Sequence, residues 1–154
     1  MIATTVPTGD RPRRRILVVE DDPAVLDLVI TRLEIAGYET RRAGDGLAAM
    51  NRLDEVRPAA VILDLNLPKL DGFGILDLMA HRADLSSIPV LVLSARSNAK
   101  DIKLAMALGA SDYLTKPFET SRLLSRVARL LLSRRPAAPP ASSSLPDDDE
   151  PFLV

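Results

Sequence analysis

The chain has 154 residues, of which 47% are apolar and 3% aromatic, so it can form one domain whose core is mainly aliphatic. Its 20 basic and 21 acidic side chains nearly balance, which gives no general attraction to nucleic acids or anionic membranes. The absence of cysteine and the single histidine exclude disulfides, thiolate metal sites and a multi-histidine zinc site within one chain.

The two ends differ in composition from the middle. Residues 1–13 contain Pro7, Gly9 and Pro12 without an apolar pattern, and we expect a flexible lead there. No signal-peptide-like apolar segment and no run of 18 apolar residues is found, so we expect a soluble cytoplasmic protein without membrane association.

The first half of the central region contains two expected strand–helix pairs. ILVV (16–19) is a continuous apolar run, typical of a buried parallel strand. Asp22, followed by a proline, is the expected N-cap of a helix that ends near Gly37. The polar, alternating segment 38–43 predicts an edge strand, and a second helix is expected over 46–56.

The second half repeats this alternation three times. The runs AAVILDL (59–65) and PVLVLS (89–94) predict two more buried strands, with a helix after Gly72 between them. Asn98 is the expected N-cap of a fourth helix, which stops at Gly109. A short strand and a long helix complete the pattern, over 112–115 and 119–133.

Five strand–helix repeats predict an α/β fold, because right-handed crossovers place the strands in a parallel sheet with helices on both faces. Ligand sites in such sheets form at the carboxyl ends of the strands. We therefore assign one domain to residues 14–133 and look for chemistry at its strand ends.

The remaining segment, 134–154, holds five of the 12 prolines, a serine run and four consecutive acids. It cannot bury enough apolar surface to offset its ordering entropy, and we expect a disordered tail or an interdomain linker. Its end, DDDEPFLV, allows two interpretations: an unstructured terminus, or a docking peptide whose last three apolar residues enter a groove.

Polar residues stand at four expected strand ends: Glu20, Asp21, Asp22, Asp64, Ser94 and Lys116. Packed carboxylates repel one another unless a cation neutralises them. Acids without histidine or cysteine ligands suit a hard divalent ion, and Mg²⁺ fits best. A Mg²⁺ site beside a lysine and a serine is a phosphate-binding arrangement.

Some of these residues also have simpler interpretations. Asp22 before a proline is interpreted as a helix cap, and Ser94 or Lys116 alone would suit a turn or a solvated surface. Asp64 differs because it interrupts an apolar run, where a charge is costly. Asp64 is therefore the strongest functional candidate.

Four motifs in order carry a family resemblance: ILVVEDDP, ILDLNLPKLDGFGIL, PVLVLSA and GASDYLTKPF. Together they resemble the receiver domain of bacterial two-component response regulators, over about 120 residues. The spacing is specific, with 43 residues from Asp21 to Asp64, 30 from there to Ser94 and 22 more to Lys116. The chain resembles single receiver domains of the chemotaxis-regulator type. This resemblance implies a flavodoxin-like doubly wound (βα)5 fold with a five-stranded parallel sheet in the order 2-1-3-4-5.

The resemblance implies that Asp64 accepts a phosphoryl group. It implies a Mg²⁺ site in which Asp21 and Asp64 bind the ion directly, Glu20 assists through water and the backbone carbonyl of Asn66 completes the set.

It further implies that Ser94 and Lys116 bind the phosphoryl oxygens, and that Tyr113 is an aromatic switch residue. Pro117 after the lysine implies a cis peptide bond that orients the lysine. Asn66 and Arg96 match the positions that tune dephosphorylation.

The implied partners are a sensor histidine kinase or phosphotransfer protein, which donates from a phosphohistidine, and a downstream effector. The readout surface is expected on the fourth helix, fifth strand and fifth helix, with a homodimer through that surface as a further expectation. His81, on the third helix, is interpreted as a surface residue and not as the donor. Without a recognition helix in the sequence, we expect no direct binding of this chain to nucleic acid.

Three alternatives remain open. In the first, the chain is either a stand-alone receiver or the receiver portion of a longer DNA-binding or enzymatic regulator. The Pro/Ser-rich segment resembles an interdomain linker and favours the longer regulator. An Asp-nucleophile phosphohydrolase is a second class, but dehalogenase-type phosphatases carry an aspartate where this chain has Asn66. A pseudo-receiver that only binds partners is the third.

Overall fold

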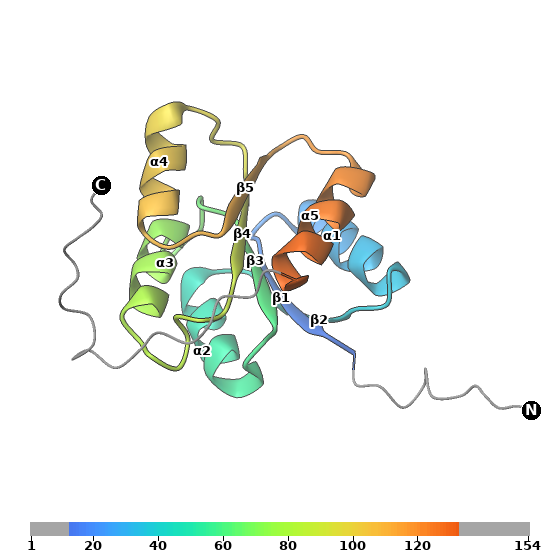
Figure 1. Ribbon diagram of the computed structural model, residues 1–154, viewed down its shortest axis with the longest axis horizontal. Helices are drawn as coiled ribbons and strands as arrows, with labels where there is room; N and C mark the ends of the chain where they lie inside the picture. The colour runs from blue at the N-terminus through green and yellow to red at the C-terminus, as the bar shows by residue number, and fades with distance from the viewer. Residues whose placement is uncertain (1–12, 133–154) are drawn as a thin grey trace, which may run out of the picture.

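The computed structural model describes residues 13–132, in which strands and helices alternate from a first strand to a last helix (Figure 1). The strands are β1 (Arg15–Val19), β2 (Glu39–Ala43), β3 (Ala60–Leu63), β4 (Val90–Ser94) and β5 (Asp112–Thr115). The helices are α1 (Pro23–Ile35), α2 (Gly46–Val56), α3 (Gly72–Ala80), α4 (Ala99–Ala107) and α5 (Thr120–Leu132). The predicted elements are all present, and the predicted α/β class is confirmed.

The strands form one parallel sheet in the order β2-β1-β3-β4-β5, which confirms the order that the resemblance implied. Val19 of β1 lies opposite Leu63 of β3, Leu63 opposite Val92 of β4, and Ser94 opposite Thr115 of β5. The carboxyl ends of these strands therefore share one edge, and the residues that follow them converge.

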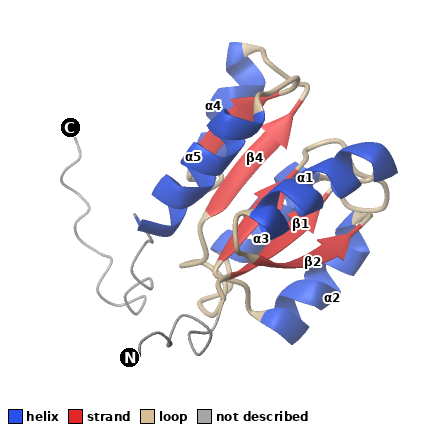
Figure 2. Cartoon of the chain, turned by 90° about the vertical axis from the view of Figure 1, so that its right-hand side faces the viewer, coloured by secondary structure: helices blue, strands red, loops and turns tan. Residues whose placement is uncertain are grey.

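Helices cover both faces of the sheet. Figure 1 shows α1 and α5 on one face and α2, α3 and α4 on the other, and Figure 2 shows the molecule from the side of α1 and α5. Successive residues of β1 alternate between two cores, with Ile16 and Val18 in the α1–α5 core and Leu17 and Val19 in the opposite one. Because both faces are buried, the inner strands are apolar without interruption, as the sequence patterns indicated.

Short polar side chains cap the N-termini of four helices. Asp22 and Asn98, both predicted as N-caps, accept backbone N–H groups of α1 and α4. Asp45 and Asp71 do the same for α2 and α3. The caps satisfy helix donors that have no partner within the helix, and thereby fix where each helix leaves the sheet edge.

Gly72 lets α3 approach the residues that follow β3. A Cβ atom at this position would lie 2.5 Å from the carbonyl oxygen of Asp64 and 2.7 Å from the Cα of Leu65. The Gly72 N–H donates to the Leu65 carbonyl at 2.9 Å. The absence of a side chain at Gly72 therefore helps to set the backbone position of Asp64.

The predicted flexible lead, apart from its last residue, and the predicted tail at 134–154 lie outside the described residues, as does the docking-peptide interpretation of the terminus. Within residues 13–132, no helix is both long and apolar enough to span a lipid bilayer.

We expect Gly72→Ala to lower the free energy of unfolding by about 1–3 kcal/mol, because the new methyl group collides with backbone that has little freedom to move. Urea unfolding followed by circular dichroism measures this change. Gly44→Ala is the matched control, since a Cβ there would meet nothing within 4 Å, and its effect should stay within about 0.5 kcal/mol. Equal stability of the two variants would contradict the close approach of α3.

Candidate functional site

Acidic residues at the ends of β1 and β3 meet at the sheet edge. The Glu20 N–H donates to the Ala43 carbonyl, and the Asp64 N–H donates to the Val19 carbonyl, both at 3.0 Å. These bonds continue the ladder of the sheet one step beyond the strands. Asp64 therefore follows β3 directly, and does not lie within the strand as the apolar run suggested.

Three carboxylates form a tight cluster there. Glu20, Asp21 and Asp64 each offer an oxygen that lies within 4.8 Å of the others. Glu20 and Asp64 are 3% and 5% exposed, whereas Asp21 is exposed. The cluster thus has a buried part, held by the sheet edge, and an open part that faces solvent.

Lys116, which follows β5, neutralises part of this charge. Its Nζ donates to Glu20 Oε1 at 2.7 Å and to Asp64 Oδ2 at 3.2 Å. The peptide bond between Lys116 and Pro117 is cis, as the resemblance implied. The other oxygens of the two acids accept backbone N–H groups, from Asp22 to Glu20 Oε2 and from Asn66 to Asp64 Oδ1.

The pKa values reflect this crowding. Burial raises the pKa of Glu20 above its ordinary value, and the charge of Asp64 adds to the effect, while hydrogen bonds from Lys116 and from the Asp22 backbone oppose it. Burial alone would lower the pKa of Lys116, but the hydrogen bond to Glu20 and the charges of both acids outweigh it and raise the pKa. Both directions follow from an excess of carboxylate in a partly buried place.

The donor set fits a hard divalent cation. Three carboxylates against one ammonium leave two negative charges uncompensated in the cluster. All ligand atoms on offer are oxygens, which Mg²⁺ prefers in proteins, and the exposed Asp21 leaves room for water in its coordination sphere. Glu20, Asp21 and Asp64 are therefore the residues that could hold the ion.

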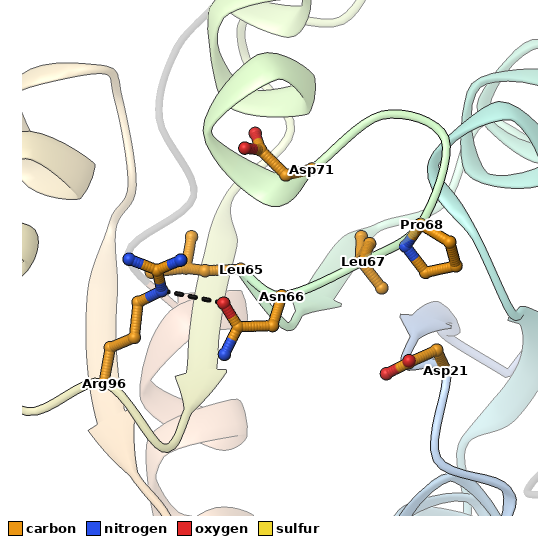
Figure 3. A pocket seen from close by; sticks show the side chains of 7 residues that line it. All are labelled: Asp21, Leu65, Asn66, Leu67, Pro68, Asp71 and Arg96. Atoms are coloured by element: carbon orange, nitrogen blue, oxygen red, sulfur yellow. Dashed lines mark hydrogen bonds between the residues drawn. The ribbon is translucent and has the colours of Figure 1, made fainter.

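Beside the cluster lies an open pocket of about 430 Å³ (Figure 3). It is lined by Asp21, Leu65, Asn66, Leu67, Pro68, Asp71 and Arg96. Figure 3 shows Asn66 between Asp21 and Arg96, and Arg96 Nε donates to Asn66 Oδ1 at 2.8 Å. The pocket gives a small anionic group access to the edge of the carboxylate cluster.

The other predicted residues surround this region. Ser94 is fully buried at the end of β4, and its Oγ accepts the Arg96 N–H at 3.2 Å. The Tyr113 hydroxyl on β5 donates to the Arg96 carbonyl at 2.7 Å. Asp22 is a helix cap, as interpreted, and His81 lies exposed at the end of α3, as expected for a surface residue.

Sequence reasoning missed two acids near the pocket. Asp71 lines it, and the Asp-Gly step after a proline-containing loop could have indicated its capping position. Asp101 pairs with Arg96 at 3.2 Å. The sequence marks Asp101 only as the acid three residues after the Asn98 cap, because the direction of the Arg96 side chain depends on tertiary packing.

Comparison with known proteins gives a consistent family. Residues 16–128 match the family model described as "Response regulator receiver domain". The chain is 41% identical over 128 residues to the DNA-binding dual master transcriptional regulator RpaA of Synechocystis, covering 83% of this chain and 53% of RpaA. It is 44% identical over 130 residues to the transcriptional regulatory protein PrrA of Mycobacterium leprae, covering 84% and 54%. The chain thus spans about half the length of these curated relatives.

Among solved structures, the fold resembles the receiver domain of the sensor histidine kinase PA1611 of Pseudomonas aeruginosa, with a TM-score of 0.74 and 28% identity. The match covers 79% of this chain and 100% of that one. That receiver domain holds a magnesium ion coordinated in its active-site cleft. The acidic cluster of this chain is typical of such a site.

We expect Asp21→Asn to weaken Mg²⁺ binding by at least about tenfold, because it removes one of three carboxylates from the ion's surroundings. Titration with MgCl₂, followed through the amide NMR signals of Glu20 and Asp64, measures the affinity. Asp22→Asn is the matched control, since asparagine caps a helix as well as aspartate and Asp22 lies outside the cluster. If both variants lose affinity equally, general negative charge and not a ligand at Asp21 holds the ion.

Proposed function

This chain belongs to the response regulator receiver family, a family of phosphoacceptor signalling domains, and we propose that Asp64 is its phosphoryl acceptor. The observation that carries the proposal is the position of Asp64: nearly buried, one residue past β3, sharing Lys116 with Glu20 in the carboxylate cluster. A carboxylate in this setting is partly neutralised by Lys116, and its neighbours Asp21, in the cluster, and Leu65, next in the chain, line the adjacent pocket.

The proposed reaction is transfer from a phosphohistidine of a sensor kinase or phosphotransfer protein. An Asp64 carboxylate oxygen attacks the phosphorus in line, an O–P bond forms, and the P–N bond breaks with its electron pair left on the imidazole nitrogen. The product is an acyl phosphate. Attack of water on its phosphorus releases inorganic phosphate and restores the carboxylate.

A bound Mg²⁺ would offset charge on the transferring group. In the proposal, Asp21 and Asp64 hold it directly, Glu20 assists through water, and Asn66 contributes its backbone carbonyl. Support comes from the oxygen donors gathered within 4.8 Å and from the uncompensated charge that they leave.

Ser94 and Lys116 are proposed to bind the phosphoryl oxygens. Lys116 already donates to Asp64, so it can follow the charge from the carboxylate to the phosphoryl group. Ser94 would move toward the phosphoryl group, and Tyr113 would follow into the space that Ser94 leaves. This shifts a pre-existing equilibrium of the surface formed by α4, β5 and α5, through which we propose effector binding and homodimer formation.

Asn66 and Arg96 are proposed to set the lifetime of the acyl phosphate. Both line the pocket beside the carboxylate cluster, and they are hydrogen-bonded to each other. A pair held in this way restricts the positions from which water can attack the phosphorus.

The proposal extends to the setting of the domain. We propose a cytoplasmic location and no direct contact of residues 14–133 with nucleic acid, which fits the balanced charge of the chain. The relatives RpaA and PrrA are regulators of transcription by name, and the match covers 53% and 54% of their length, which favours a receiver portion of a longer DNA-binding regulator over a stand-alone module. The family match favours a signalling domain over the dehalogenase-type phosphohydrolase, and the retained acidic cluster with Lys116 favours it over the pseudo-receiver.

We expect phosphoramidate and Mg²⁺ to add the mass of one phosphoryl group to the wild type and none to Asp64→Asn, because the amide cannot form the acyl phosphate. The added mass should be lost on treatment with hydroxylamine and should not form with EDTA present. Intact-protein mass spectrometry reads each state.

Asp77→Asn is the control, since Asp77 is an exposed acid on α3 that pairs with His81. It should be modified as fast as the wild type. Equal modification of Asp64→Asn would overturn the assignment, and sustained phosphate release over many turnovers would favour the phosphohydrolase.

A further inference from the structure

The side chain of Arg96 connects the pocket to α4. Its Nε donates to Asn66 Oδ1 at 2.8 Å, and its Nη1 pairs with Asp101 Oδ2 at 3.2 Å. The guanidinium also lies over the ring of Phe73 on α3, 5.6 Å from its centroid. Arg96 therefore contacts the β3–α3 loop, α3 and α4 at once.

The backbone of Arg96 touches both groups proposed to move. Its N–H donates to Ser94 Oγ at 3.2 Å, and its carbonyl accepts the Tyr113 hydroxyl at 2.7 Å. A displacement of Arg96 thus alters the surroundings of Ser94 and Tyr113 together.

Helix α4 depends on few contacts at its start. Ala105 is the one buried residue within its range, all of which is described, whereas α1, α3 and α5 each have four. The first turn is held by Asn98, whose Oδ1 accepts the Asp101 N–H at 2.8 Å and whose Nδ2 donates to Asp101 Oδ2 at 2.9 Å. Arg96 donates to that same Oδ2. Asp101 is accordingly the residue through which Arg96 acts on α4.

We propose that Arg96 is a phosphoryl-binding residue that exchanges Asp101 for the phosphoryl group on Asp64 and thereby loosens the start of α4. The inference rests on the proposed function of Asp64. Phosphorylation brings new acceptor oxygens to a pocket that the guanidinium already lines. Phosphate is a stronger, bidentate partner for arginine, and the bond to Asp101 is a partly exposed ion pair of the weak kind.

Beryllofluoride with Mg²⁺, an analogue of the bound phosphoryl group, tests the exchange by NMR. In the wild type, we expect the amide signals of Ser94, Asn98 and Asp101 to shift. In Arg96→Ala, the Ser94 signal should still shift, while the shifts of Asn98 and Asp101 should be largely lost. Equal shifts of these two amides in both proteins would overturn the exchange.

A second variant, at Asp101, tests whether Arg96 must leave this residue to bind the phosphoryl group. Asp101→Asn keeps the hydrogen bonds with Asn98 but weakens the hold on Arg96. We expect beryllofluoride to bind this variant about two- to fivefold more tightly, the factor that corresponds to one partly exposed ion pair. In the Arg96→Ala background, Asp101→Asn should change the affinity little, because the two residues act as a pair.

Asp27→Asn is the matched control, since it removes an ion pair with Arg42 that has the same 3.2 Å length and lies elsewhere. Its affinity for beryllofluoride should equal that of the wild type. If Asp101→Asn also tightens beryllofluoride binding when Arg96 is already alanine, the proposed exchange is overturned. A wild type with no shift at Ser94 would contradict the proposed function itself.

Discussion

The site depends on the contact that Lys116 makes with Glu20 and Asp64. Burial has removed most of the hydration of both carboxylates, and without a cation nothing would offset that loss or their mutual repulsion. Removing one partner of a buried ion pair costs about 3–5 kcal/mol, so the three residues form a unit. Because β5 does not pair with β1 or β3, this contact also ties together distant strands of the sheet.

The same contact explains which parts of the site could be predicted from the sequence. Each member follows a strand directly, and the strands before Glu20 and Asp64 are covered on both faces and therefore visible as apolar runs. The charge of Asp64 interrupts such a run and is therefore conspicuous, and the (βα)5 alternation predicts that it meets Glu20 and Lys116. Asp22 could be separated from its neighbours because a proline follows it, and it does cap α1.

The network of Arg96 could not be predicted in the same way. Arginine has a long, flexible side chain, and its partners Asn66 and Asp101 lie on different elements. The packing of α3 and α4 determines which nearby acid pairs with Arg96. No periodicity in the sequence indicates that pairing. The position of Asp64 beyond the end of β3 was missed because the apolar pattern continues past it with the buried Leu65, so the run does not show that the strand ends at Leu63.

A conformational switch needs a part that stays in place and a part that moves. In this domain α5 buries four residues, whereas α4 buries one. Helix α5 places four residues in the core that it shares with α1, so moving it would expose a large apolar area. Helix α4 buries Ala105 and relies on polar contacts at its start. Polar contacts can be exchanged for others at little net cost, whereas buried apolar area cannot. In the proposed switch, a change of charge at the pocket would therefore act on α4, the helix of the readout surface with the least buried apolar area to lose, and would leave intact the core that positions Asp64.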